Sequence, residues 1–328
     1  MAAGRPRAPT FIVPPNEILA PAQIATEHWR LASLCVAFQS DEDCLQWAAR
    51  RRLIHNTMTC SGCGRPASLV AHSDSIDSKR WKCRSCNFVR SVRADSFFQR
   101  SHLQLDQIIV MVYCWACDMP QKQISREANI PCRNTVVDWC NFCRDETENH
   151  LERNPQEIGG FDANGEQIVV EIDETKFFHG KYHRGQWREG HWVFGGIERG
   201  SAKCFLVEVP DRTAHTLQQK IQQYILPGTH IISDGSAAYA DIPQIAGGIY
   251  SHEVVVHERH FVSPNDDTVH TQNIQNTWMR AKRKLRRQFG TSRQLFPTYI
   301  HEFVFRNSMR HKELFSEFLV CVGTSYPV

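Results

Sequence analysis

The chain has 328 residues, of which 41% are hydrophobic and 22% charged, a balance typical of a folded protein with a buried core. Its formal net charge of +3 is too small to indicate a partner by itself. No run reaches the roughly 18 to 20 apolar residues of a membrane span, and residues 1–15 lack the apolar core of a signal peptide. We therefore expect an intracellular protein of about two domains.

Two segments precede the first cysteine motif. Residues 1–15 hold four prolines with little periodicity, and we expect a disordered arm there. Residues 16–55 carry apolar side chains at helical spacing, which predicts short N-terminal helices.

Residues 56–100 contain two CxxC pairs, Cys60 with Cys63 and Cys83 with Cys86, separated by 19 residues. Each pair forms a tight knuckle that directs two thiolates to one point, and two knuckles make the closed tetrahedral site of structural zinc. The chain has 13 cysteines and no secretion signal, which argues against a disulfide framework. The spacing predicts a zinc ribbon.

Residues 101–150 read as helices. Residues 121–128 and 132–144, joined by a short turn that contains Pro131, have the size of a helix-turn-helix. The N-terminal end of the second helix of such a motif usually reaches base edges in the major groove, and here it offers Arg133, Asn134 and Thr135. The pattern predicts binding to double-stranded DNA, while a small helical domain that only contacts proteins stays an alternative.

Residues 151–166 resemble a linker in composition, and residues 167–312 alternate predicted strands with helices, which predicts an α/β domain. The remaining residues 313–328 are expected to form a C-terminal tail. Within the α/β domain, strands are predicted at 167–173, 191–198, 204–209, 230–233 and 252–257, and helices at 213–224 and 271–287.

One predicted strand of this domain ends in Asp173, and Asp234 directly follows another. Side by side, such strands would hold both carboxylates near one Mg²⁺ or Mn²⁺ ion. Two-metal phosphoryl transfer uses this kind of carboxylate clamp around the attacking and leaving oxygens. Each aspartate alone is equally typical of a turn.

The last long helix is basic. Six of the eight residues from Arg280 to Arg287 are Lys or Arg. Such a run is usually a solvated helix face, and it also suits phosphate contacts, for which Lys282, Arg283 and Arg286 are our candidates.

Several motifs, in a consistent order and spacing over roughly residues 60–310, resemble the Merlin superfamily of DDE transposases and their bacterial insertion-sequence relatives with an ISXO-like transposase domain. The resemblance implies an RNase H-like mixed sheet flanked by helices, preceded by the zinc ribbon and helix-turn-helix. It implies Mg²⁺- or Mn²⁺-dependent cleavage and strand transfer of terminal inverted-repeat DNA by a homodimer or larger oligomer, in the nucleus of a eukaryote or the cytoplasm of a bacterium. Asp173 and Asp234 match the first two catalytic acids. The matching stretches are VEIDETKF at 170–177, WVFGGIERG at 192–200, PGTHIISD at 227–234, AY at 238–239, VH at 256–257, FVSP at 261–264 and HTQNI at 270–274.

The third acidic position departs from the family pattern. The family usually carries Glu three residues before a Trp, followed seven residues later by Lys or Arg; here Gln275 precedes Trp278 and Lys282. A neutral amide binds Mg²⁺ weakly and cannot take up a proton, although some bacterial relatives carry Asn there. Two functions therefore stay open: a DDE recombinase with an intact or weakened site, and a transposon-derived, domesticated DNA-binding regulator without enzyme activity. A protein-interaction scaffold is a third class.

Overall fold

The computed structural model describes residues 8–178, 190–255, 262–263, 266–287 and 292–328. The chain divides into two compact units, one made of Met1–Glu146 with Met309–Val328 and the other of Thr147–Ser308. Among the described residues, no helix combines the length and apolar character needed to cross a membrane.

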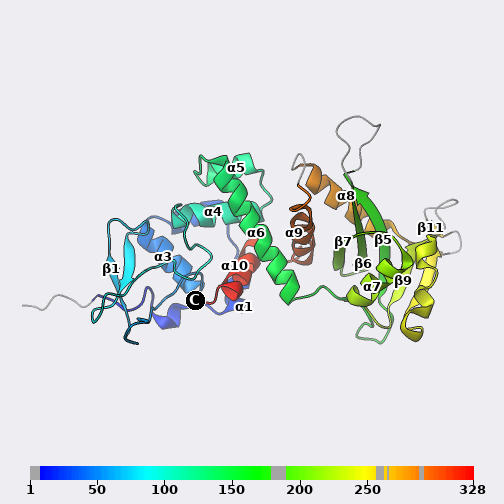
Figure 1. Cartoon of the computed structure of the whole chain (residues 1–328), viewed down its shortest axis with the longest axis horizontal. Coiled ribbons are helices and arrows are strands. Elements are labelled where there is room, and N and C mark those ends of the chain that lie inside the picture. The colour runs from blue at the N-terminus through cyan, green and yellow to red at the C-terminus, as the bar shows by residue number, and fades with distance from the viewer. Residues whose placement is uncertain (1–7, 179–189, 256–261, 264–265, 288–291) are drawn as a thin grey trace, which may run out of the picture. The chain divides into compact units, whose positions relative to one another are not determined.

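The first unit is mostly helical, and α4 forms its centre because nine of its twelve residues are apolar and buried. Aromatic side chains of α10 pack against it: the rings of Trp115 and Phe318 lie 4.9 Å apart, and those of Tyr113 and Phe315 lie 5.3 Å apart. The helices of this unit are η1 (Pro15–Glu17), α1 (Pro21–Ala25), α2 (Leu31–Ala37), α3 (Asp41–Arg50), α4 (Leu105–Ala116), α5 (Gln121–Glu127), α6 (Arg133–Arg153, which continues into the second unit) and α10 (Leu314–Ser325) (Figure 1).

Both ends of this unit differ from the expectation. Ile12 and Val13 are buried, and their backbone N–H groups donate to Asn56 Oδ1 at 3.1 and 2.8 Å, so the expected disordered arm is wrong for residues 8–15. Residues 1–7 lie outside the described part of the chain. The expected C-terminal tail is the helix α10, because its apolar residues complete the core around α4.

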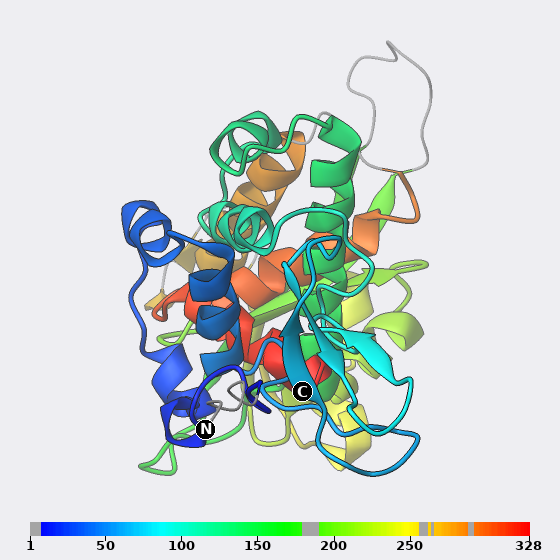
Figure 2. The same ribbon diagram turned by 90° about the vertical axis from the view of Figure 1, so that its left-hand side faces the viewer.

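A three-stranded antiparallel sheet, in the order β1-β2-β3, follows α3 and is drawn in cyan in Figure 2. Its strands are β1 (Ser68–Ala71), β2 (Lys79–Lys82) and β3 (Val89–Ser91). Trp81 is fully buried, and Arg93 Nε donates to the buried carboxylate of Asp77 at 2.8 Å. Arg93 also donates to the carbonyl of Leu103, which joins this sheet to the segment before α4.

The second unit contains a five-stranded sheet in the order β10-β9-β5-β6-β7. Strands β5, β6 and β7 form an antiparallel meander, and β9 and β10 run parallel to β5. This order and these directions are those of the RNase H-like fold, so the expected fold class is confirmed. The strands are β5 (Val169–Phe177), β6 (His191–Glu198), β7 (Cys204–Val209), β9 (His230–Asp234) and β10 (Ser251–Val255).

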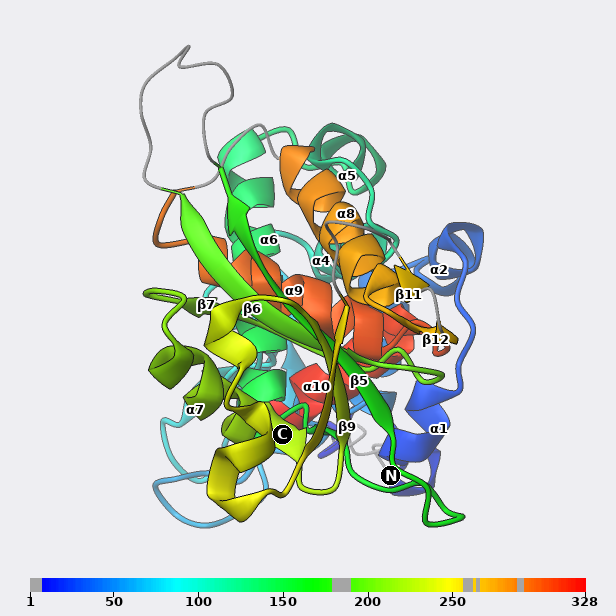
Figure 3. The ribbon, with the colours of Figure 1, turned by 90° about the vertical axis from the view of Figure 1, so that its right-hand side faces the viewer.

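Helices cover both faces of this sheet (Figure 3). Because successive strand residues point to opposite faces, Val170 and Ile172 pack with α7 (Ala214–Tyr224), whereas Phe177 packs with α8 (Gln272–Arg286) and α9 (Phe296–Ser308). The unit also includes β4 (Ile158–Gly159) paired with β8 (Ile225–Leu226), η3 (Ala237–Tyr239), η4 (Ile242–Gly247), and β11 (Val262–Ser263) paired with β12 (Asp266–His270).

The segment expected to be a linker, residues 151–166, is structured in part. Its strand β4 pairs with β8, and Gly159 donates its backbone N–H to the carboxylate of Glu198 at 2.9 Å. The helix α6 also runs to Arg153, well beyond the expected end near residue 144.

The first prediction concerns α10. Replacing Phe318 by Ala should lower the free energy of unfolding by about 3–5 kcal/mol, because it removes a fully buried ring from the core around α4. Thr324→Ala on the exposed face of the same helix should stay within about 0.5 kcal/mol of wild type. Urea denaturation of the full chain measures both, and equal small effects would show that α10 does not belong to this core.

Candidate functional site

Asp173 and Asp234 lie level with each other on neighbouring parallel strands. The strands β5 and β9 pair in register from Val169 with His230 to Glu171 with Ile232. Two residues further along both strands come Asp173 and Asp234, and the alternation of strand side chains directs both to the same face as Glu171. The structure therefore brings together the two aspartates that are far apart in sequence.

The carboxyl group of Asp173 is electrostatically crowded. Burial, followed by the negative charges of Glu174 and Asp234, raises its pKa to about 7. The backbone N–H of Glu174 donates to Asp173 Oδ1 at 2.8 Å and offsets this effect only in part. A divalent cation bound between two such carboxylates would reduce the repulsion between their negative charges.

The helix α8 lies on the face of β5 that carries Asp173. Trp278 Nε1 donates to Asp173 Oδ2 at 3.1 Å, and the ammonium group of Lys282 contacts Thr175 Oγ1 and lies 5.4 Å from the centre of the Phe177 ring. Burial lowers the pKa of Lys282. Trp278 and Lys282 thus bring the middle of α8 onto the acidic strand.

Gln275 is three residues before Trp278 and seven before Lys282, so the three share one side of α8. Its side chain is exposed, and its amide donates to Thr271 Oγ1 of the preceding turn at 3.4 Å. Gln275, the residue expected at the third position, therefore lies on the helix that contacts β5, but its hydrogen bond stays within its own segment.

A glycine makes this packing possible. Gly195 is the cross-strand partner of Asp173, and a Cβ atom there would lie 2.8 Å from Trp278 Cη2 and 2.5 Å from Leu206 Cδ2. Only a residue without a side chain lets the indole ring pass over β6 and reach the carboxylate. Sequence reasoning missed this role, although Gly195 lies within the WVFGGIERG stretch.

Glu174 was also missed, although it follows Asp173 directly. It points to the opposite face of β5, where the buried Tyr239 hydroxyl and Arg212 Nη1 donate to its carboxylate, the latter at 3.4 Å. Glu174 therefore influences Asp173 through charge and does not share its face.

Comparison with known proteins identifies one family model that matches part of the chain. Residues 163–308 match the family model described as "ISXO2-like transposase domain". The expected kinship with DDE transposases is confirmed for this segment. No curated protein matches the chain. Of the stretches that suggested the resemblance, residues 256–257 and 261 lie outside the described part of the chain, as does residue 264.

Retroviral integrases are among the solved structures that match part of this chain. The catalytic core of BIV integrase is 14% identical, with 42% of this chain and 80% of that chain covered at a TM-score of 0.29. The HTLV-2 integrase core in complex with magnesium, in its dimeric form, is 13% identical, with 42% and 83% covered at a TM-score of 0.29. The simian T-cell lymphotropic virus intasome in complex with PP2A regulatory subunit B56 gamma is 14% identical, with 53% and 57% covered at a TM-score of 0.29.

The basic residues of the transposase-like domain separate into two groups. Arg283 and Arg286 are exposed on α8, together with Met279, which is 62% exposed. Lys282 is half-buried and turned toward β5. The arginines are thus free to meet a partner from solvent, whereas Lys282 belongs to the surroundings of Asp173.

The two helices expected to form a helix-turn-helix are α5 and α6. Ile124, Ile130 and Val136 are buried, and Gln107 of α4 donates to the carbonyl of Asn129 in the turn at 2.8 Å. At the start of α6, Arg133 and Asn134 are exposed and Thr135 is half-buried.

The four cysteines of the predicted ribbon converge. All four Sγ atoms lie within 4.8 Å of one another, with Cys60 to Cys86 at 3.1 Å, Cys63 to Cys83 at 3.5 Å and Cys63 to Cys86 at 3.8 Å. A tetrahedral zinc site with Zn–S bonds of about 2.3 Å separates its sulfurs by roughly 3.8 Å. This is the only group of three or more Cys, His, Asp or Glu residues close enough to hold a metal within the described ranges.

The charges of these thiols also favour a cation. The backbone N–H of Ser85 is the main cause that lowers the pKa of Cys83 to about 6, whereas Cys60 raises the pKa of Cys86 to about 12. Thiols this close cannot all ionise unless a cation balances them. The four-cysteine cluster therefore fits a metal such as zinc. The chain has two further CxxC pairs, in and beside helices of the first unit. Cys114, Cys140 and Cys143 are buried there, whereas Cys117 is exposed, so an expectation that all four pack in the core is wrong for Cys117.

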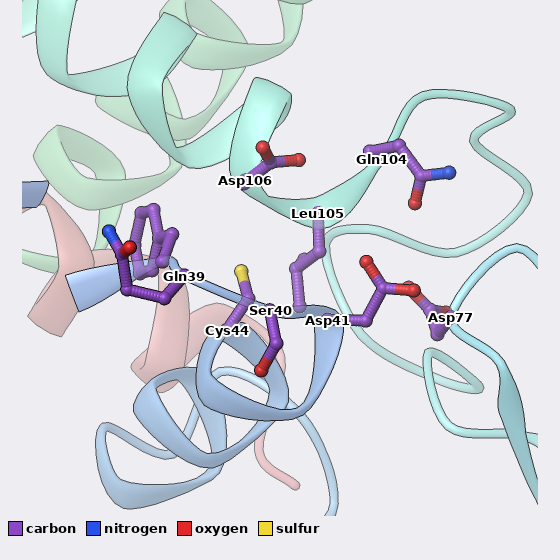
Figure 4. Close-up of a pocket in the computed structure, with 9 residues that line it drawn as sticks. Gln39, Ser40, Asp41, Cys44, Asp77, Gln104, Leu105 and Asp106 are labelled. Carbon is purple, nitrogen blue, oxygen red and sulfur yellow. The ribbon is translucent and has the colours of Figure 1, made fainter. Parts of the chain in front are cut away.

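A cavity of about 200 Å³ in the first unit is shown in Figure 4. Three acids line it, but Asp77 is paired with Arg93, and Asp41 accepts a hydrogen bond from Ser78 Oγ at 3.0 Å. Asp106 lies in the first turn of α4, where the helix dipole favours a negative charge. Asp41 and Asp77 therefore have structural partners.

The second prediction concerns the cysteine cluster. The purified chain should hold one zinc ion, and Cys83→Ser should lose it and weaken the first unit by several kcal/mol, since structural zinc sites contribute directly to folding. Elemental analysis and thermal unfolding measure both effects. Cys35→Ser, which changes an exposed cysteine outside the cluster, is the control. A chain that stays free of zinc after refolding with excess metal would contradict the prediction.

The third prediction concerns pH. The pKa of the Asp173 carboxyl is 3.8 in the unfolded chain and about 7 in the folded one. The free energy of unfolding of wild type should therefore fall as the pH rises between these values, and then level off. Asp173→Asn removes this effect, and the variant should be more stable than wild type at pH 8, by up to about 4 kcal/mol, but not at pH 4. Denaturation of both proteins in chelator at several pH values measures the difference. A difference that is independent of pH would contradict it.

Proposed function

We propose that residues 163–308 form a DDE-type transposase domain that cleaves DNA and transfers its strands with the help of bound Mg²⁺ or Mn²⁺. The supporting observation is that Asp173 and Asp234 each lie two residues beyond the last paired residues of adjacent strands, and that the charge of Asp234 raises the pKa of Asp173. Carboxylate oxygens in this arrangement suit a hard divalent cation.

In this proposal, Asp173 and Asp234 are the metal ligands and Gln275 occupies the third position. When bound, the metal ions activate the attacking oxygen and stabilise the leaving oxygen of a phosphodiester. Trp278 fixes the orientation of the Asp173 carboxylate through its indole N–H. Lys282 holds a positive charge beside Asp173, where it can meet a DNA phosphate.

The substrate we propose is double-stranded DNA that ends in transposon inverted repeats. Arg133, Asn134 and Thr135 at the start of α6 are the candidates for base contacts, because the N-terminal end of such a helix fits the major groove. Arg283 and Arg286 are the candidates for phosphate contacts, since they are exposed on α8 next to the acidic strand.

The proposal extends to the setting in which the protein acts. A structural zinc ion held by Cys60, Cys63, Cys83 and Cys86 completes the DNA-binding part, and the protein acts as a homodimer or larger oligomer on DNA. Its place is the nucleus if the host is a eukaryote, and the cytoplasm if the host is a bacterium.

A second candidate function is a domesticated DNA-binding regulator without catalysis, and Gln275 is the observation that favours it. Three carboxylates would offset three of the four positive charges of two Mg²⁺ ions, whereas two carboxylates and an amide offset only two. The amide also donates to Thr271 in its present orientation, so its oxygen must compete for a metal without the advantage of charge.

The fourth prediction separates these functions. A duplex selected by binding from a random-sequence pool should be nicked by wild type with Mn²⁺, and Asp173→Asn and Asp234→Asn should lose nicking while they still bind the duplex. Gln275→Glu should raise nicking by at least roughly tenfold, because it restores a charged ligand. Gel assays of cleavage and of binding measure both properties on the same samples.

Each outcome decides between the alternatives. Nicking by wild type supports the recombinase. Nicking by Gln275→Glu alone identifies a disarmed enzyme that now serves as a DNA-binding protein. If neither protein nicks with any metal but both bind DNA, the recombinase proposal fails and the regulator remains. Absence of DNA binding by the zinc-loaded protein would eliminate both.

A further inference from the structure

Glu171 is a fully buried carboxylate two residues before Asp173 on β5. Its Oε1 accepts from Arg199 Nε at 2.7 Å and from Asn273 Nδ2 at 2.7 Å. Its Oε2 accepts from the backbone N–H groups of Asn273 at 2.8 Å and Ile274 at 3.1 Å. One carboxylate therefore joins a strand of the sheet to the first turn of α8.

The first turn of α8 depends on this carboxylate. The first N–H groups of a helix have no partner within the helix and are usually satisfied by the side chain of the residue before it. The preceding residue, Thr271, makes no such hydrogen bond. Glu171, about a hundred residues earlier in the chain, accepts these N–H groups instead. Its negative charge is also favourable at the positive end of the helix dipole.

Arg199 reinforces the same junction. Its Nη2 donates to the backbone carbonyl of His270, two residues before the start of α8, at 2.7 Å, while its Nε donates to Glu171. The end of β12 and the start of α8 are thus both held to the sheet by this ion pair.

This anchor and the Asp173–Trp278 hydrogen bond hold α8 at two points. Glu171 and Asp173 are roughly 7 Å apart along β5, and their partners Ile274 and Trp278 are one helical turn apart. Gln275 lies between these two points, so its place relative to Asp173 and Asp234 is set by both contacts.

We infer that Glu171 is a positioning residue that fixes the start of α8, and thereby the third ligand position, against the Asp173–Asp234 pair. The statement about the third metal ligand rests on the proposed function. The statement that Glu171 anchors α8 does not, because it follows from the hydrogen bonds of Glu171.

The test compares Glu171→Gln with Glu198→Gln in the full chain. Glu198 is a matched control, because it is a buried glutamate of the same sheet whose carboxylate accepts from Gly159 N–H and Ser201 Oγ instead of from α8. Asn273→Ala is a second, milder variant that removes one donor to Glu171 and leaves the ion pair with Arg199 intact.

Three readouts are measured on each protein: amide exchange of Asn273 and Ile274 by NMR, the indole N–H resonance of Trp278, and Mn²⁺ binding by titration. Glu171→Gln should speed both amide exchanges, shift the indole resonance and weaken Mn²⁺ binding by about 10- to 100-fold, the usual range for residues behind a metal ligand. Asn273→Ala should act in the same direction to a smaller extent. Glu198→Gln should leave all three readouts at wild-type values.

The outcomes separate this inference from the proposed function. If Glu171→Gln and Asn273→Ala leave both amide exchanges and the indole resonance at the values of Glu198→Gln, the positioning role is overturned, whatever the metal data show. If Glu171→Gln does not fold, Asn273→Ala decides by the same readouts. If wild type binds no Mn²⁺, the proposed function and the metal part of the inference fail together, while amide exchange still decides whether Glu171 anchors α8.

Discussion

The face of β5 under α8 carries Glu171, Asp173 and Thr175, three polar side chains in the middle of a folded unit. A buried carboxylate is costly unless hydrogen bonds or opposite charges accompany it. Here Glu171 receives backbone N–H groups and Arg199, whereas Asp173 receives one indole N–H, one backbone N–H and two repelling neighbours. Glu171, whose charge is matched by its partners, holds α8 to the sheet. Asp173, whose charge is opposed by its neighbours, keeps an affinity for cations or protons.

This difference explains why α8 is the element on which the site depends. Its buried residues Ile274, Trp278 and Leu285 pack in the core, while Gln275, Arg283 and Arg286 on the same helix stay exposed. A helix anchored at its first turn presents these exposed residues at defined distances from Asp173. Under the proposed function, the amide of Gln275 therefore lowers the negative charge near Asp173 and leaves the framework of α8 intact.

The first unit is stabilised by different interactions. Its ribbon has short strands and a small apolar core around Trp81, so the four thiols and the Asp77–Arg93 pair carry much of its cohesion. The helices behind it pack around α4 through aromatic contacts that include residues from α10. Consequently, residues from both ends of the sequence meet in one core.

Sequence alone determined the features that depend on local spacing. The CxxC pairs, the apolar runs of β5, β6 and β7, and the apolar positions of α8 each follow from residues close together in the chain, so the zinc-type cluster, the strands and the long helix could be predicted. The tertiary structure alone decided three other features: that Glu171 caps a helix a hundred residues away, that Gly195 makes room for Trp278, and that α10 belongs to the first unit. No local pattern contains these facts, because each is a contact between distant segments whose energy exists only after the chain has folded.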